Sequence, residues 1–172
     1  YFLRRDTQVV ITLAKDLSFN HVLRLRYSNT STSNSWPAGA YKNYSRFYLP
    51  ANSLIRQFKV GEKTLTPSDY TATSEHGKTV VGYLMTVPIN STVGVELEYQ
   101  VPGKLTGESP TYSWYWQKQP GTGSSEPLTV YLNYPLYLKP QVISPAAELG
   151  IQQLQFNLKN DTDHRLSVNF TQ

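Results

Sequence analysis

The stretch Val93-Gly94-Val95-Glu96-Leu97-Glu98-Tyr99-Gln100-Val101 places an apolar side chain at every second position. Successive side chains of a β-strand point to opposite faces of a sheet, so this stretch predicts a strand with one buried and one exposed face. Elsewhere in the chain, no long segment repeats its apolar residues with the period of a helix. The pattern therefore favours an all-β fold.

The same alternation recurs along the chain between turn residues such as Gly, Pro, Asn and Asp. Further strands are expected at residues 8–14, 21–27, 44–49, 54–60, 70–73, 79–87, 112–117 and 128–133, with a terminal hairpin at 154–158 and 166–170. Residues 135–145 contain several Pro and are expected to cross a sheet edge, whereas residues 146–151 form one helical turn at most. About ten short strands predict an antiparallel β-sandwich, immunoglobulin-like in architecture.

Two of these strands are expected to be neighbours in one sheet. Leu23–Tyr27 carries two Arg on its exposed face, and Val95–Tyr99 carries two Glu on its own. Because opposite charges directly across a strand pair favour pairing, we expect Arg24 and Arg26 to approach Glu96 and Glu98 on the solvent side.

Length and composition suit one sandwich. The chain has 172 residues, of which 39% are hydrophobic and 13% aromatic, and all-β domains of this size are commonly single units. We expect a single domain over residues 1–172. The alternative is a second small sandwich that begins at the loop 103–110 and leaves few strands on each side. Because the chain starts at Tyr1 without an initiator Met, we expect it to be a piece of a longer, anchored protein.

Charge and cysteine content exclude several classes of protein. Residues 1–86 hold 11 Lys and Arg against 5 Asp and Glu, whereas residues 87–172 hold 5 against 7. A nucleic-acid binder would carry a denser basic stripe, so no nucleic-acid partner is expected. The absence of Cys rules out a disulfide framework, thiol catalysis and Cys-based zinc sites. No apolar run reaches the roughly 18 residues of a membrane helix, so we expect no membrane contact by this segment itself.

The aromatic stretch Tyr112–Gly121 invites comparison with antibodies. Its Trp-Tyr-x-Gln-Lys-x-Pro-Gly run resembles the strand C to C′ region of light-chain variable domains. The missing Cys and the 113 residues before Trp114 argue against an immunoglobulin variable domain. Strand alternation places Tyr112, Trp114 and Trp116 on one face, and we expect Trp114 and Trp116 to be buried in the core.

A second set of short motifs covers most of the chain. In order, these are Tyr48-Leu49-Pro50, Gly77–Tyr83, Val87-Pro88, Leu97-Glu98-Tyr99 and Gln117–Thr122. The set resembles the C-terminal, β-rich region of uncharacterised, membrane-anchored bacterial surface proteins that carry a domain of unknown function. The resemblance implies that a membrane anchor and a larger domain precede this region, and that the genes are associated with surface polysaccharide pathways. It carries over no catalytic residues.

Exposed aromatic side chains are the candidate ligand-binding residues. Flat rings offer apolar faces on which sugars can stack, although Trp and Tyr are also common core residues. Trp36 follows a polar loop, Tyr41 lies shortly before the next expected strand, and Tyr44 lies at its start. We therefore predict Trp36, Tyr41 and Tyr44 as ligand-binding residues.

No catalytic or metal-binding constellation is expected. The three histidines fall in predicted turns or at strand ends: His21, His76 and His164. The motifs of a serine-hydrolase elbow and of a zinc peptidase are absent from the sequence. Asp161-Thr162-Asp163 lacks the other ligands of a calcium loop and suits a hairpin turn. Glu96 and Glu98 could mimic a glycosidase carboxylate pair, but a charged solvent face explains them equally well.

Together, these patterns and the resemblance predict a non-enzymatic, extracytoplasmic structural or binding module on a bacterial cell surface. No cofactor and no metal are expected, and the expected partners are a surface polysaccharide or another envelope protein. The alternative is a carbohydrate-binding accessory or enzyme domain that acts on surface polysaccharide. A large cleft lined by exposed rings and paired carboxylates would favour this alternative.

Overall fold

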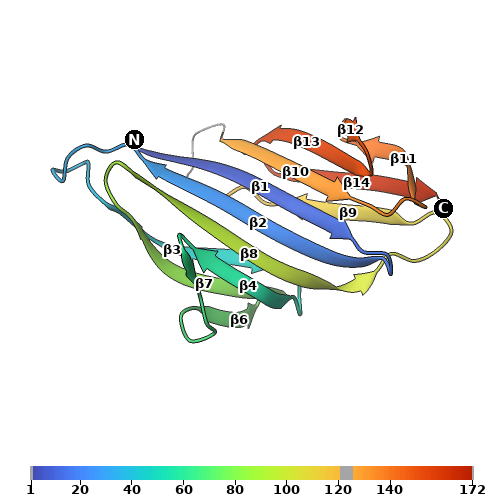
Figure 1. Cartoon of the computed structure of the whole chain (residues 1–172), viewed down its shortest axis with the longest axis horizontal. Helices are drawn as coiled ribbons and strands as arrows, with labels where there is room; N and C mark the ends of the chain where they lie inside the picture. The colour runs from blue at the N-terminus through green and yellow to red at the C-terminus, as the bar shows by residue number, and fades with distance from the viewer. Residues whose placement is uncertain (1, 121–125, 172) are drawn as a thin grey trace. The chain divides into compact units, whose positions relative to one another are not determined.

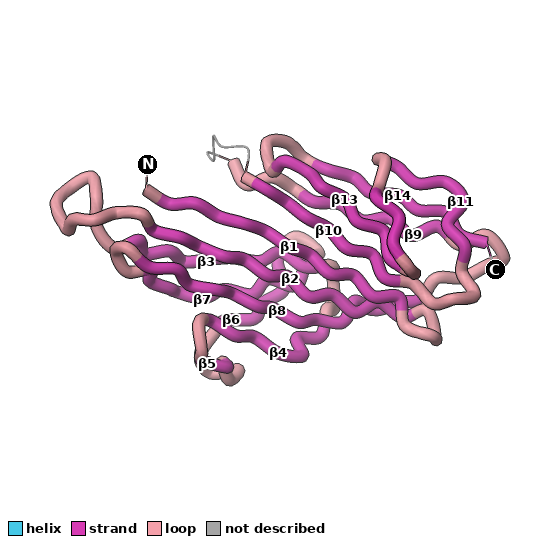
Figure 2. The backbone as a smooth tube through the Cα atoms, turned by 45° about the horizontal axis from the view of Figure 1, so that its top comes forward, coloured by secondary structure: helices cyan, strands magenta, loops and turns pink. Residues whose placement is uncertain are grey.

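The computed structural model describes residues 2–120 and 126–171, and every element in them is a strand or a connection between strands (Figures 1 and 2). The strands are β1 (Leu3–Leu13), β2 (Ser18–Asn29), β3 (Tyr41–Leu49), β4 (Leu54–Val60), β5 (Lys63–Thr64), β6 (Thr71–Glu75), β7 (Lys78–Val87), β8 (Ser91–Lys104), β9 (Thr111–Trp116), β10 (Pro127–Asn133), β11 (Lys139–Ser144), β12 (Glu148–Gly150), β13 (Gln153–Lys159) and β14 (His164–Thr171). The all-β prediction is confirmed. No helix in the described residues is long and apolar enough to cross a membrane.

The described residues form fourteen strands where about ten are expected from the sequence. The Pro-rich stretch 135–145 contains β11, whose pairing with β14 shifts register between Pro140 and Val142. Residues 146–151 contain the short strand β12 and not a helical turn, because β13 provides an edge with which they pair. Gly121 and Thr122, at the end of the predicted Trp turn, lie outside the described residues.

The chain divides into two compact units. Unit 1 comprises Tyr1–Asp6 and Val22–Pro102, and unit 2 comprises Thr7–His21 and Gly103–Gln172. The boundary after Pro102 coincides with the start of the loop 103–110. Strands β1 and β2 each contribute residues to both units. A single domain over the whole chain stays a prediction.

In unit 1, two sheets pack around one aromatic residue. One sheet contains the run β2-β8-β4-β5, and the other has the order β3-β7-β6. The ring of Phe58 on β4 is buried and meets the ring of Phe47 on β3 edge-on at 6.0 Å. It also meets Tyr83 on β7 at 5.7 Å. Because these contacts join residues from both sheets, they form the core that fixes β3 and β7 in place.

The predicted neighbourhood of the Arg and Glu strands and the approach of Arg24 to Glu96 are confirmed, whereas the approach of Arg26 to Glu98 stays a prediction. Strands β2 and β8 are neighbours in the sheet order. The Arg24 Nε donates to Glu96 Oε2 at 2.7 Å, and Lys59 on β4 reaches the same carboxylate at 3.8 Å. Glu96 therefore lies between cations from both neighbouring strands, as expected for a charged solvent face.

Unit 2 also contains two sheets. One contains the run β12-β13-β10-β1, and the other has the order β11-β14-β9. Strands β1 and β10 run parallel, so this sheet is not wholly antiparallel as the sequence predicts. The buried Phe156 on β13 and Phe170 on β14 belong to the core.

The terminal hairpin is a wrong prediction. Strand β13 pairs with β10 and β12, whereas β14 pairs with β9 and β11. Residues 160–163 therefore connect two sheets. Alternation shows that both arms have a buried face, but two strands that stack face to face across a core carry the same pattern as two that pair edge to edge.

The aromatic strand β9 follows the predicted alternation. Tyr112 is buried, while Trp114 and Trp116 are half-buried and stack on each other with ring centroids 5.8 Å apart. The Trp116 Nε1 donates to the Asn160 side-chain oxygen at 2.8 Å. The shared face is confirmed, but full burial of both Trp is wrong because β9 is an edge strand of its sheet.

Candidate binding face

The sheet β3-β7-β6 exposes one face to solvent and turns the other toward the core of unit 1. On β3, Ser45, Phe47 and Leu49 are buried, while Tyr44, Arg46 and Tyr48 are exposed. Strand β7 lies between β3 and β6, with Arg46 and Thr71 both opposite Gly82. A hairpin turn at His76 and Gly77, both with positive φ, connects β6 to β7. We call the exposed side of this sheet the outer face.

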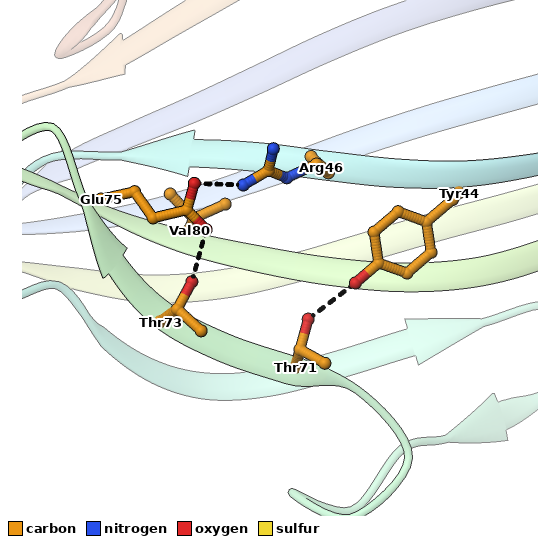
Figure 3. A pocket seen from close by; sticks show the side chains of 6 residues that line it. All are labelled: Tyr44, Arg46, Thr71, Thr73, Glu75 and Val80. Carbon is orange, nitrogen blue, oxygen red and sulfur yellow. Dashed lines mark hydrogen bonds and ion pairs between the residues drawn. The ribbon is translucent and has the colours of Figure 1, made fainter.

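The hydroxyl end of the Tyr44 ring lies over the backbone of Gly82. A Cβ atom at Gly82 would approach the Tyr44 Cζ to 2.9 Å and would collide with the Tyr44 hydroxyl. That hydroxyl shares a hydrogen bond of 2.9 Å with the Thr71 hydroxyl (Figure 3). Only glycine leaves room for the ring at this position, so Tyr44 is held in one orientation although its side chain is 52% exposed.

The Arg46 guanidinium occupies the centre of the outer face. It donates to the Glu75 carboxylate at 2.5 Å and lies 5.2 Å from the centre of the Tyr48 ring. Glu75 also accepts a hydrogen bond from the Thr73 hydroxyl at 3.0 Å. The hydrogen bond from Arg46 lowers the pKa of Glu75, and the same bond raises the pKa of Arg46. Both groups are therefore ionised and paired at neutral pH.

Together these side chains border a shallow hollow of about 410 Å³ (Figure 3). Six residues line it: Tyr44, Arg46, Thr71, Thr73, Glu75 and Val80. Val80 is buried and forms its apolar floor. An aromatic ring, hydroxyls and a charge pair in one open face suit recognition of a ligand that offers both apolar surface and hydroxyl or amide groups.

The predicted ligand-binding residues do not share one surface. Tyr44 lies on the outer face, but Tyr41 is half-buried and lies on the inner side of the same strand because the two positions differ by an odd number. Trp36 lies in the loop before β3 and is 92% exposed. Whether these residues bind a ligand stays a prediction.

Sequence reasoning missed the partners of Tyr44 on the outer face. Arg46 and Tyr48 could have been found, because alternation puts every second residue of β3 on the same side as Tyr44. Thr71 and Glu75 could not have been found, since their approach to Tyr44 and Arg46 depends on the register of β6 and β7.

The other polar candidates have structural roles. His21 is buried within β2 and not in a turn, with its Nε2 3.3 Å from the Tyr112 hydroxyl. Asp163 accepts hydrogen bonds from the Tyr115 hydroxyl and the Lys118 backbone, which lower the pKa of its carboxyl. Among the described residues, no group of three His, Cys, Asp or Glu side chains could hold a metal ion.

No family model matches the chain, and no curated protein matches it. Solved structures do resemble it. A "putative nutrient binding protein" from Legionella pneumophila subsp. pneumophila str. Philadelphia 1 is 8% identical with a TM-score of 0.62, over 99% of this chain and 67% of that protein. Native leukotriene A4 hydrolase from Saccharomyces cerevisiae is 8% identical with a TM-score of 0.57, over 98% of this chain and 29% of the hydrolase. At such identities the likeness shows the fold alone.

Proposed function

We propose that the chain is a non-enzymatic binding module of a bacterial surface protein, displayed outside the membrane, and that the outer face of β3-β7-β6 contacts its partner. The observation that carries this proposal is the fixed and exposed arrangement of Tyr44, Arg46 and Tyr48. Exposed aromatic residues and arginine are typical of binding hot spots. Because Gly82 and Thr71 already hold the Tyr44 ring, binding orders few side chains, and little conformational entropy is lost.

The location and the finer architecture belong to the same proposal. Two sheets that pack across a core in each unit suit an immunoglobulin-like arrangement, which in many proteins serves as a display or recognition module on cell surfaces. The resemblance to membrane-anchored bacterial proteins supports an extracytoplasmic position. The partner is then a surface polysaccharide or another envelope protein.

The second candidate is a carbohydrate-binding accessory or enzyme domain that acts on surface polysaccharide. The exposed Tyr44 ring favours it, because an aromatic ring open to solvent offers a face on which a sugar can stack. The Thr71 and Thr73 hydroxyls lie beside that ring on the same face. An enzyme would also need an acid or a base, and the one carboxylate of the hollow is Glu75, which Arg46 keeps ionised.

A binding screen with matched variants tests the proposal. Purified chain is applied to immobilised bacterial polysaccharides and envelope proteins, and each partner found is titrated with the Tyr44→Ala, Tyr48→Ala double variant. We expect the double variant to lose at least about tenfold in affinity, as for two truncated hot-spot residues. Tyr115→Ala is the control, because Tyr115 is also 52% exposed and its hydroxyl also bonds a neighbour, but it lies in unit 2.

Three outcomes would contradict either the outer face as the binding surface or the non-enzymatic role. Equal loss in the Tyr115 control, or no loss in the double variant, would remove the outer face as the binding surface. Release of new sugar ends from a bound polysaccharide, abolished by Glu75→Gln, would favour the enzyme domain instead.

A further inference from the structure

The loop between β2 and β3, residues 30–40, presents one tryptophan to solvent. Trp36 is 92% exposed, the greatest exposure of any Trp in the described residues. A large aromatic ring in water forgoes the free energy that burial would give it, so an exposed Trp is a candidate contact residue.

The buried Asn29 side chain, at the base of the loop, holds the loop by hydrogen bonds. Its Nδ2 donates to the backbone oxygens of Gly39 at 2.9 Å and Val87 at 3.2 Å. Its Oδ1 accepts a hydrogen bond from the Ser31 backbone N–H at 3.0 Å. Asn29 thus joins the first residues of the loop to its last ones and to the end of β7.

The buried Ser31 makes a second set of bonds within the same loop. Its hydroxyl donates to the Ser33 backbone oxygen at 3.0 Å and accepts from the Gly39 backbone N–H at 2.9 Å. The Ser31 backbone oxygen accepts from the Asn90 N–H at 2.9 Å. Since loss of either side chain would leave buried polar groups without partners, this network holds the loop in one conformation.

The loop and the turn that bonds to Ser31 carry no charge of their own, and the nearest basic residue on a segment bonded to the loop is Arg4, two residues beyond Phe2, whose backbone oxygen accepts from Thr30. Neither residues 27–41 nor residues 84–95, which include the turn that bonds to Ser31, contain a single Asp, Glu, Lys or Arg. Nucleic acids and acidic polysaccharides require cations. A lipid surface requires a broad apolar face with basic residues, whereas this loop has one large apolar side chain. The remaining class is an uncharged ligand that offers a face to the ring and hydroxyl groups to polar neighbours such as Asn34 and Ser35.

We propose that loop 30–40 is a preformed stacking site for an uncharged glycan, with Trp36 as the contact residue and Asn29 and Ser31 as positioning residues. The inference rests on the proposed function, since it assumes that the chain binds a partner. It adds the class of ligand and a contact that lies outside the outer face.

The contact is tested by ¹⁹F NMR of the chain labelled with 5-fluorotryptophan, in which Trp36→Phe assigns the Trp36 signal. The probes are soluble neutral glucan, mannan and galactan oligosaccharides, alginate as an acidic glycan, and phosphatidylglycerol vesicles. We expect at least one neutral probe to shift the Trp36 signal and leave those of Trp114 and Trp116 in place. Trp36→Ala should then weaken binding by about tenfold, the worth of one ring stack in a binding site.

The positioning role is tested with Asn29→Ala and Ser31→Ala, against Asn43→Ala as control. Asn43 is a half-buried amide of unit 1 that donates a hydrogen bond to the Ser45 hydroxyl within β3. We expect the first two variants to sharpen the Trp36 signal through added motion, to speed amide exchange over residues 31–39 and to lower glycan affinity. The control should do none of these, and Ser31→Ala remains informative if Asn29→Ala fails to fold.

The results separate this inference from the proposed function. A shift caused only by alginate or vesicles, or no shift with any neutral probe, overturns the inference. If no neutral probe moves the Trp36 signal while a partner binds the outer face, the inference fails and the proposed function stands. If a neutral probe shifts the Trp36 signal while the Tyr44→Ala, Tyr48→Ala variant binds its partner as tightly as the unchanged chain, the inference stands and the outer face is removed from the proposed function.

Discussion

At the scale of single residues, Gly82 and Tyr44 show how backbone and side chain depend on each other. Glycine weakens a strand interior because it has no side chain to pack. Here the Tyr44 ring covers the space that a Cβ would fill, so the strand β7 keeps a packed surface at this position. The Tyr44 orientation on which the proposed function depends therefore rests on a residue that has no side chain.

Gly82→Ala should displace the Tyr44 ring. We expect unfolding free energy to fall by about 1–3 kcal/mol, the usual cost of overpacking. In a Tyr44→Ala background the same change should cost less, because of the two obstacles to the added Cβ only the Thr71 hydroxyl remains. Urea denaturation of the two single variants and the double variant measures this coupling. Additive costs would show that the ring does not occupy the space above Gly82.

His21 makes stability depend on pH. Burial lowers the pKa of its imidazole from the usual 6.5 to about 4, so the folded chain keeps the ring neutral while the unfolded chain protonates it. The unfolded state binds more protons between these values, and stability therefore rises with pH from about 4 to 6.5 and then levels off. The total change is about 3 kcal/mol, from two to three pKa units at 1.36 kcal/mol each.

Replacement of His21 tests that account. His21→Gln should flatten the pH dependence of the unfolding free energy between pH 4 and 6.5, whatever it does to stability at pH 7. Urea titrations at several pH values give the measurement. A slope that survives the substitution would assign the dependence to other groups.

At the scale of elements, alternation predicted which side of a strand is buried but not which strands pair. It correctly put Tyr112, Trp114 and Trp116 on one face. It could not show that β9 lies at an edge, which leaves both Trp only half-buried. For the same reason, it could not reveal that Thr71 and Glu75 would meet Tyr44 and Arg46, since register is a property of two strands and not of one.

Trp116 links β9 to the connection between β13 and β14. Its Nε1 donates to Asn160, whose side-chain nitrogen is buried with no hydrogen-bond partner among the described residues. Trp116→Phe should therefore lower the unfolding free energy by about 1–3 kcal/mol, because a buried acceptor loses its partner. Trp114→Phe, which keeps an aromatic ring in the stack, should cost less. Equal costs would show that ring size and not the hydrogen bond decides stability here.

At the scale of the whole chain, we predicted a single domain, and only the alternative with a second sandwich placed a boundary where the two units divide. The loop 103–110 coincides with the boundary after Pro102. That Thr7–His21 belongs with the C-terminal half could not be foreseen, because it depends on the parallel pairing of β1 with β10, residues more than 100 positions apart. Long-range pairing of this kind leaves no local pattern.

The central claim is that the outer face of β3-β7-β6 contacts the partner. Backbone amide NMR during titration with a partner from the binding screen tests it most directly, because every strand reports separately. We expect shifts concentrated on β3, β6 and β7, with the largest near Tyr44, Arg46 and Thr71, and lost in the Tyr44→Ala, Tyr48→Ala variant. Shifts confined to unit 2, or unchanged in that variant, would contradict the claim.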